Sequence, residues 1–198
     1  MSAPANPMSR RVGPDAIRTT ANAITTARLL FTVPVLMMIL GDQRGADSWA
    51  TFTGWLVLWV TDGIDGWFAR RDGTTRSGAF LDPLADKILV LGGFFALAIR
   101  GDIGWLPVAI IAAREVAISL YRVLEGRRGV SMPARRLGKW KANVQFLAIS
   151  LVLFPPTSDI GWLHDTALWA AVLITVISGI DLVRAARRAE EASSTHEM

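Results

Sequence analysis

The sequence contains no cysteine and only two histidines among its 198 residues. Without cysteine, the chain has neither a disulfide framework nor a thiolate for metal binding or nucleophilic catalysis. The histidines, His164 and His196, fall in a predicted loop and in the C-terminal tail. These absences argue against a histidine-based metal site and against a catalytic triad.

Apolar residues, in contrast, make up 52% of the chain, and the mean hydropathy is +0.36. Because they gather in several long runs, they indicate a polytopic membrane protein rather than a soluble domain. The net charge of +4 comes from basic residues in short segments beside the apolar runs. That distribution is typical of membrane topology and lipid-surface contact, so no nucleic-acid partner is expected.

The apolar runs predict an all-α integral membrane fold with six transmembrane helices. We expect these helices at about residues 21–40, 49–69, 79–99, 105–124, 142–154 and 166–183. Residues 1–19 form a polar tail that can fold as an interfacial helix, residues 20–185 form the membrane domain, and residues 186–198 form a charged tail. Six of the tryptophans lie mostly near predicted helix ends, which is typical of an interfacial belt.

The connections between the predicted helices differ sharply in charge. Basic residues gather in the N-terminal tail, in the turn near residue 73, in the loop near residue 130 and after residue 183. The remaining connections carry mainly aspartate. The positive-inside rule therefore predicts a multi-pass protein of the cell membrane with both termini in the cytoplasm.

The stretch over residues 61–87, TDGIDGWFARRDGTTRSGAFLDPLADK, holds four aspartates at the edge of apolar runs. Asp62 and Asp65 are three apart and share one face of a helix, and Asp82 and Asp86 are four apart on the next. Two such helices can point all four carboxylates into one space. Four ionised carboxylates at close quarters require cations, and Mg²⁺ or Mn²⁺ are the natural occupants.

The arrangement Asp62-x-x-Asp65-Gly66-x-x-Ala69-Arg70, followed by Gly78-x-x-x-Asp82-x-x-x-Asp86, closely resembles the signature of the CDP-alcohol phosphatidyltransferases. The segment between Arg70 and Gly78 is one residue shorter than is usual in that family. Within the family, the segment GAFLDPLADK is most similar to phosphatidylglycerophosphate synthases. The likeness extends to the regions around Asn22, Arg114 and Lys139 and spans roughly residues 22–145.

The resemblance implies transfer of a phosphatidyl group from CDP-diacylglycerol to glycerol 3-phosphate, with release of CMP. It also implies two divalent cations, Mg²⁺ or Mn²⁺, held by Asp62, Asp65, Asp82 and Asp86. Asp86 is in addition the implied general base, which takes the proton from the attacking glycerol hydroxyl. A homodimer surrounded by membrane lipid is expected from the family alone.

The resemblance also implies a surface for the nucleotide and lipid donor. Its candidate residues are Asn22, Thr25, Arg28, Gly66, Ala69, Arg70 and Gly78. The first three share one side of the first helix, where ordinary hydrogen bonding between helices is an equally good interpretation. Small residues three or four apart also serve close helix packing in membranes.

Four basic residues are candidates for binding the acceptor phosphate, namely Arg114, Arg122, Lys139 and Lys141. An arginine inside an apolar helix needs an anionic partner, and the phosphate of glycerol 3-phosphate is a suitable one. In the alternative interpretation, Arg114 pairs with Glu115 or with an aspartate. The loop residues would then set topology or hold anionic lipid headgroups.

Other functions remain open from the sequence. Phosphatidylglycerol as acceptor would define a cardiolipin synthase, and inositol phosphate a phosphatidylinositol-phosphate synthase. Membrane prenyltransferases also use aspartates and Mg²⁺, but their motifs usually lie far apart in sequence. An ion-coupled transporter is the non-enzymatic alternative, and it is disfavoured because the carboxylates lie at one face of the bilayer with no second cluster.

Overall fold

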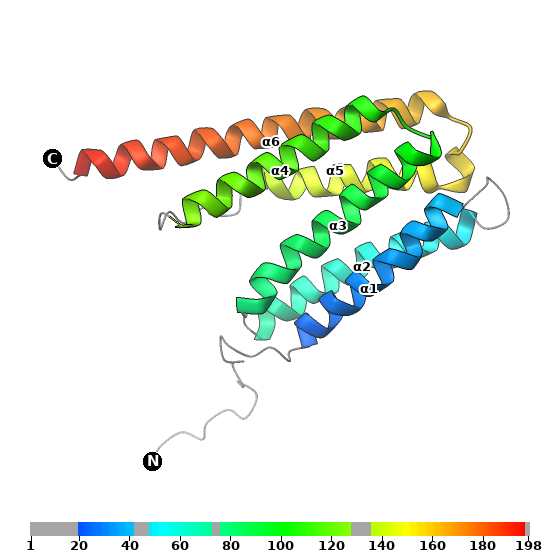
Figure 1. Cartoon of the computed structure of the whole chain (residues 1–198), viewed down its shortest axis with the longest axis horizontal. Helices are drawn as coiled ribbons and strands as arrows, with labels where there is room; N and C mark the ends of the chain where they lie inside the picture. Colours follow the sequence, from blue (N-terminus) through cyan, green and yellow to red (C-terminus); the bar gives the residue numbers. More distant parts are fainter. Residues whose placement is uncertain (1–19, 42–47, 73–75, 128–135, 197–198) are drawn as a thin grey trace, which may run out of the picture. The chain divides into compact units, whose positions relative to one another are not determined.

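The computed structural model describes residues 20–41, 48–72, 76–127 and 136–196, with side chains over 23–41, 49–64, 83–126, 137–138 and 140–187. The described residues form helices joined by short turns, with no strand among them. In chain order these are α1 (Thr20–Gly41), α2 (Ser48–Asp72), α3 (Arg76–Arg100), α4 (Trp105–Arg127), α5 (Arg136–Leu153), the short 3-10 helix η1 (Pro155–Thr157) and α6 (Gly161–His196) (Figure 1). The predicted all-α fold is therefore confirmed, while the predicted N-terminal tail lies outside the described residues.

The structure corrects several expectations near the C-terminus. Helix α6 begins at Gly161 and continues to His196, so it is longer at both ends than the predicted helix over residues 166–183. His164 lies in the first turn of α6 and is buried, rather than in a loop. Trp55 is also fully buried, so it does not belong to an interfacial belt.

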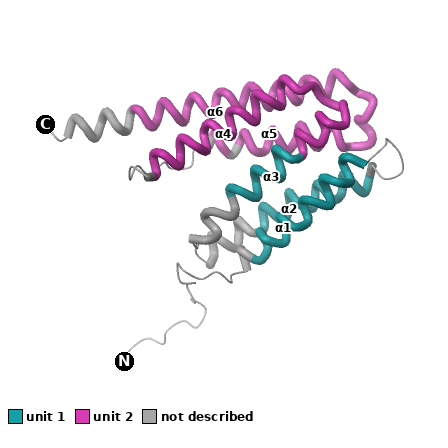
Figure 2. Tube along the Cα trace, viewed as in Figure 1, with its two compact units in different colours: residues 1–92 teal, residues 93–198 magenta. Residues whose placement is uncertain are grey.

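The chain divides into two compact units, residues 1–92 and 93–198 (Figure 2). In the first unit α1 packs along α2. A Cβ atom placed on Gly54 would lie 3.2 Å from Val35 Cγ2, and one placed on Gly92 would lie 2.6 Å from Leu36 Cδ1. Because glycine has no side chain at these two positions, α1 can approach α2 and the first part of α3 closely.

In the second unit α6 packs against both α4 and α5, and η1 connects α5 to α6. The turn after α3 has two backbone hydrogen bonds, from Gly101 N to Ala98 O and from Asp102 N to Leu97 O, at 3.1 and 3.0 Å. This pattern is a Schellman cap, which requires a left-handed residue, and Gly101 has φ of 85°. The left-handed conformation of Gly101 therefore allows the tight turn between α3 and α4.

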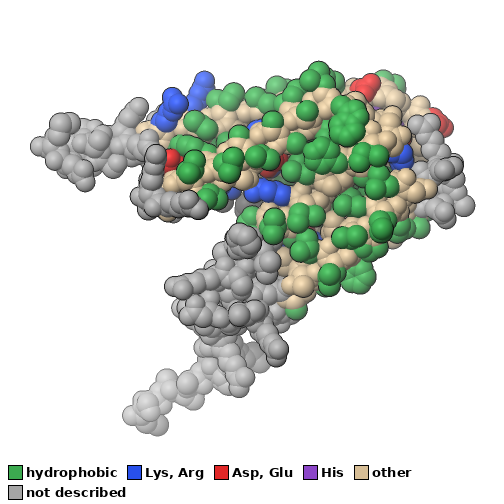
Figure 3. Space-filling model, viewed as in Figure 1, with side chains coloured by type: hydrophobic (Ala, Val, Ile, Leu, Met, Phe, Trp, Pro, Cys, Tyr) green, Lys and Arg blue, Asp and Glu red, His purple; other side chains and the backbone are tan. Residues whose placement is uncertain are grey.

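Two of the described helices are long and apolar enough to cross a membrane, over Ala23–Gly41 and Gly161–Arg187. A shorter apolar stretch covers Trp140–Leu153 in α5. Helices α2, α3 and α4 have 25, 25 and 23 residues, but they carry the charged motif residues, which lower their mean hydropathy. Figure 3 shows hydrophobic side chains spread over much of the displayed face.

Candidate active site

The four motif aspartates lie on two consecutive helices, as the spacing predicts. Asp62 and Asp65 fall in the C-terminal half of α2, and Asp82 and Asp86 fall in the N-terminal half of α3. The side chains of Asp62 and Asp86 are described, and both are partly exposed. Those of Asp65 and Asp82 lie outside the described side chains, so the convergence of all four carboxylates stays a prediction. Within the described residues, no three histidine, cysteine, aspartate or glutamate side chains come together.

Arg28 on α1 forms an ion pair with Asp62 on α2 through its Nη1 atom. The arginine side chain is 1% exposed, while that of Asp62 is 42% exposed. Thr32 Oγ1 donates a hydrogen bond of 2.8 Å to the carbonyl of Arg28, and Thr25 is buried one turn earlier. A guanidinium that is buried in this way is stabilised by the adjacent carboxylate. Arg28 therefore fixes the first aspartate of the motif from a neighbouring helix.

Several predicted donor-binding residues cannot be placed by their side chains. Asn22 lies on α1, and the others lie at the end of α2 or the start of α3, all outside the described side chains: Gly66, Ala69, Arg70 and Gly78. Their roles stay predictions. Among the donor-binding candidates, the structure thus describes the side chains of Thr25 and Arg28, which are both buried, and Arg28 contacts Asp62.

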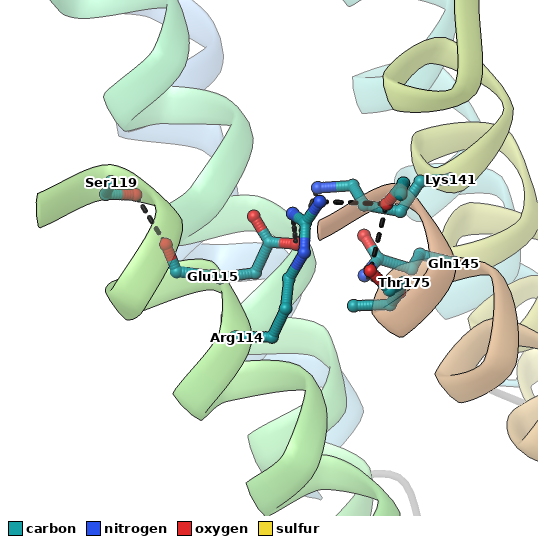
Figure 4. A network of polar contacts seen from close by, with 7 residues as sticks. Arg114, Glu115, Ser119, Lys141, Gln145 and Thr175 are labelled. Carbon is teal, nitrogen blue, oxygen red and sulfur yellow. Dashed lines mark hydrogen bonds and ion pairs between the residues drawn. The ribbon is translucent and has the colours of Figure 1, made fainter. Parts of the chain in front are cut away.

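The second unit holds a buried polar network that joins α4, α5 and α6 (Figure 4). Glu115 Oε1 accepts hydrogen bonds from Arg114 Nη1 at 2.9 Å and from Lys141 Nζ at 2.6 Å. Arg114 Nη2 donates to Ser178 Oγ at 2.8 Å, which ties α4 to α6. The three charged side chains are between 7% and 13% exposed. Two cations thus share one carboxylate in an apolar setting.

A second part of this network links α5 and α6 without charge. Gln145 Nε2 donates a hydrogen bond of 2.8 Å to Thr175 Oγ1, and both side chains are buried. Ser178 Oγ also donates to the carbonyl of Thr175 at 2.9 Å. These polar groups satisfy one another and hold α5 and α6 in register beside Lys141.

The structure brings together two of the four predicted acceptor-binding residues, Arg114 and Lys141, although they are distant in sequence. Glu115 lies between them, so the alternative pairing of Arg114 with Glu115 is also present. Arg122 is exposed and follows Arg114 by eight residues, about 12 Å along α4. The side chain of Lys139 lies outside the described residues. Ser178 was not predicted from the sequence. The feature that could have indicated it is the presence of Thr175 and Ser178 one turn apart in an apolar helix.

Comparison with known proteins places this site in a family. Residues 18–177 match the CDP-alcohol phosphatidyltransferases. A Mycobacterium tuberculosis protein named "Probable phosphatidylglycerophosphate synthase" is 37% identical over 172 residues, covering 85% of this chain and 81% of that protein. The Bacillus subtilis CDP-diacylglycerol–glycerol-3-phosphate 3-phosphatidyltransferase is 34% identical over 176 residues, covering 80% and 90%. A Rickettsia bellii protein of the same name is 31% identical over 172 residues, covering 84% and 94%.

The helical fold and the paired aspartate motif thus define a phosphatidyltransferase of the membrane type. The chain belongs to the CDP-alcohol phosphatidyltransferase family. The resemblance drawn from the aspartate motif and its flanking residues is confirmed, including the likeness to phosphatidylglycerophosphate synthases. The matched residues contain the four aspartates together with Arg114, Glu115 and Lys141.

Proposed function

We propose that this protein transfers the phosphatidyl group of CDP-diacylglycerol to glycerol 3-phosphate, giving phosphatidylglycerophosphate and CMP in phospholipid biosynthesis. The names of the Bacillus and Rickettsia relatives state this reaction. One structural observation supports an acceptor that carries a phosphate, namely the meeting of Arg114 and Lys141 on a single oxygen of Glu115. Glycerol 3-phosphate and inositol phosphate both suit that pair of cations, and the names of the relatives favour glycerol 3-phosphate.

The donor set fits the two divalent cations that the family implies. Asp62 and Asp86 offer carboxylate oxygens, and Asp65 and Asp82 follow at helical spacing on the same two helices. Hard oxygen ligands of this kind suit Mg²⁺ and Mn²⁺. When bound, such cations neutralise the diphosphate of the donor and the charge of the departing CMP. Arg28 orients the Asp62 carboxylate from α1.

The reaction forms one bond and breaks one. The hydroxyl oxygen of glycerol 3-phosphate forms a bond to the β-phosphorus of CDP-diacylglycerol, and the bond from that phosphorus to the bridging oxygen breaks. The bridging oxygen keeps the electron pair and leaves with CMP, while the hydroxyl proton passes to a carboxylate oxygen of Asp86. Positioning and charge neutralisation supply most of the acceleration.

The acceptor phosphate is held by Arg114 and Lys141, with Arg122 and Lys139 contributing positive charge nearby. Glu115 offsets one of the two buried charges, so a net positive charge remains for a phosphate. Glu115 also keeps both cationic side chains in place before the substrate arrives. This preorganisation lowers the cost of binding a small, highly charged molecule.

Six helices span the membrane in this proposal, with the aspartate motif and both termini on the cytoplasmic side. A helix of 23 to 25 residues is about 35 to 38 Å long, enough to cross a hydrocarbon core of about 30 Å. The basic connections support the orientation. We expect a homodimer, as in the family, with the donor entering from membrane lipid and the acceptor from the cytosol.

The test is CMP release by the purified full-length protein from CDP-diacylglycerol, measured across a panel of acceptors, with Asp82→Asn as the inactive control. Release with glycerol 3-phosphate alone, lost in the variant, supports the proposal. Release with inositol phosphate or phosphatidylglycerol instead would overturn the acceptor and keep the reaction class. Absence of aspartate-dependent release with every acceptor would overturn the transferase proposal itself.

A further inference from the structure

Helix α3 contains a proline between two aspartates of the motif. Pro83 directly follows Asp82 and comes before Asp86 in the sequence. The helix is continuous from Arg76 to Arg100, so Pro83 lies beyond its first turn. A proline at such a position is unfavourable, because it has no N–H group and its ring clashes with the carbonyl of the residue four positions earlier. Choices that oppose the local structure in this way are expected mainly at functional sites.

The residue four positions before Pro83 is Ala79. Its backbone carbonyl would normally accept a hydrogen bond from the N–H of residue 83, and proline has no N–H to donate. At the edge of a membrane, such a carbonyl needs another partner, since little water is present to replace the lost bond. One backbone oxygen inside the aspartate motif is thus released from the hydrogen bonding of the helix.

The released carbonyl lies on the side of α3 that carries the aspartates. Ala79, Asp82 and Asp86 follow one another at steps of three and four residues, so they share one face of the helix. Pro83 lies on this side and is exposed, whereas Ala85, on the opposite side, is only 2% exposed. The carbonyl is therefore on the open side of α3 together with the carboxylates, and not on its packed side.

We propose that Pro83 frees the carbonyl of Ala79 to act as a further oxygen ligand for a divalent cation. A backbone carbonyl is a hard oxygen donor of the kind that joins carboxylates around such cations. It adds a ligand without adding another negative charge beside the four aspartates, which would repel it. This role of Ala79 rests on the cation site of the proposed function, and it extends that site from side chains to the backbone.

The test is the binding of Mn²⁺ to the purified full-length protein in detergent, followed by electron paramagnetic resonance without any substrate. Pro83→Ala restores the N–H group, which should draw the carbonyl of Ala79 back into the helix and weaken Mn²⁺ binding about tenfold. Alanine also favours the helix more than proline does, so the melting temperature measured with a chelator should not fall. A proline with a purely structural role would not combine weaker cation binding with undiminished stability.

Pro34 on α1 provides a matched control. It also lies inside a helix, but the residues three and four positions away on its face are exposed apolar side chains, namely Leu30, Met37 and Met38. Pro34→Ala should therefore leave Mn²⁺ binding at the wild-type value, again without a fall in melting temperature.

A second measurement asks whether the carbonyl itself contacts the cation. In protein whose alanines carry a magnetic isotope at the carbonyl carbon, electron–nuclear double resonance should detect a coupling between bound Mn²⁺ and that carbon. Ala79→Gly keeps a backbone carbonyl at this position but removes its label. The coupling should therefore disappear in Ala79→Gly while Mn²⁺ is still bound.

Several results would overturn the inference. These are absence of Mn²⁺ binding by the wild type, equal binding by the wild type and Pro83→Ala, or no coupling to the labelled carbonyl. Equal weakening by Pro34→Ala would also overturn it, because the effect would then come from helix bending in general. The proposed reaction can fail separately: the role of Ala79 holds if Pro83→Ala alone weakens binding and the coupling is present, even when no acceptor supports CMP release.

Discussion

Glu115 binds two cationic side chains that come from different helices. It therefore links α4 to α5, in addition to pairing with Arg114, its neighbour in sequence. Its Oε1 atom accepts from Arg114 on α4 and from Lys141 on α5. Removing one partner of a buried ion pair typically costs about 3 to 5 kcal/mol, because the remaining charge is left uncompensated. A phosphate that enters the site takes over part of this role. Stability and acceptor binding should therefore be linked through this residue.

Glu115→Gln should lower the melting temperature of the protein without substrate and should strengthen its response to glycerol 3-phosphate. Both effects have one cause. Without the carboxylate the two cations are left uncompensated, which lowers stability, and a bound phosphate then compensates them, which raises it. Thermal unfolding in detergent, with and without glycerol 3-phosphate, measures this. Glu125→Gln is the matched control, because Glu125 is also a buried glutamate on α4. An equal response of wild type and Glu115→Gln would contradict the role given to the carboxylate.

Lys141→Gln should raise KM for glycerol 3-phosphate by about tenfold or more and leave KM for CDP-diacylglycerol nearly unchanged. The reason is the loss of a charge-assisted contact to the acceptor phosphate. Arg122→Gln should have a smaller effect, about fivefold or less, because that side chain is exposed. Steady-state kinetics with each substrate varied separately distinguish the two. A rise confined to KM for the lipid donor would assign Lys141 to the donor instead.

Individual residues show where prediction from sequence succeeds and where it ends. The helical spacing of the aspartates was sufficient to place them on two consecutive helices, because that inference needs only local geometry. The ion pair between Arg28 and Asp62 could not be predicted, since its partners are separated by 34 residues. The spacing of the aspartates predicts the helix face on which they lie. The residue of α1 that contacts this face depends on how α1 packs against α2, which the spacing does not give.

Helix positions were predicted well for α1 to α4, and the larger differences occur in α5 and α6. The segment after Arg184 is rich in alanine, arginine and glutamate, which are good helix formers. The high charge of this segment led to the prediction of a tail. Its high helix propensity, and its direct continuation from the apolar part of α6, instead extend the helix to His196. The same reasoning applies to the basic start of α5 at Arg136. Hydropathy marks the apolar part of a helix and says little about its polar extension.

The close contact between α4 and α6 leads to a prediction for Gly179. Gly179→Ala would place a Cβ 3.0 Å from Arg114 Nε, so the guanidinium must shift. Alanine raises helix propensity by about 1 kcal/mol, so stability should be kept while acceptor binding weakens. Gly126→Ala is the control, because no atom lies within 4 Å of a Cβ at that position of α4.

Kinetics and thermal unfolding of both glycine variants test this prediction. The expected result is a KM for glycerol 3-phosphate that rises in Gly179→Ala and stays at the wild-type value in Gly126→Ala. An unchanged KM in both variants would show that the position of the Arg114 side chain against α6 does not matter for the acceptor.

The whole chain is suited to a direct test of its membrane topology because it lacks cysteine. We expect Ser158→Cys to react with a membrane-impermeant maleimide in intact cells. Gly126→Cys should react only after lysis, since α4 ends there beside the basic cytoplasmic loop. Both positions are exposed, so access within the protein is matched. Labelling of both in intact cells, or of Gly126→Cys alone, would contradict the proposed orientation.

The central claim is that the aspartates on α2 and α3 hold divalent cations for phosphatidyl transfer to glycerol 3-phosphate. The most direct test is CMP release by the purified protein after chelation and then during titration with Mg²⁺ or Mn²⁺, compared with Asp62→Asn and Asp86→Asn. The account predicts no release after chelation, recovery on adding cation, and a loss of at least about a hundredfold in both variants. Release that continues without divalent cation, or that survives in both variants, would contradict it.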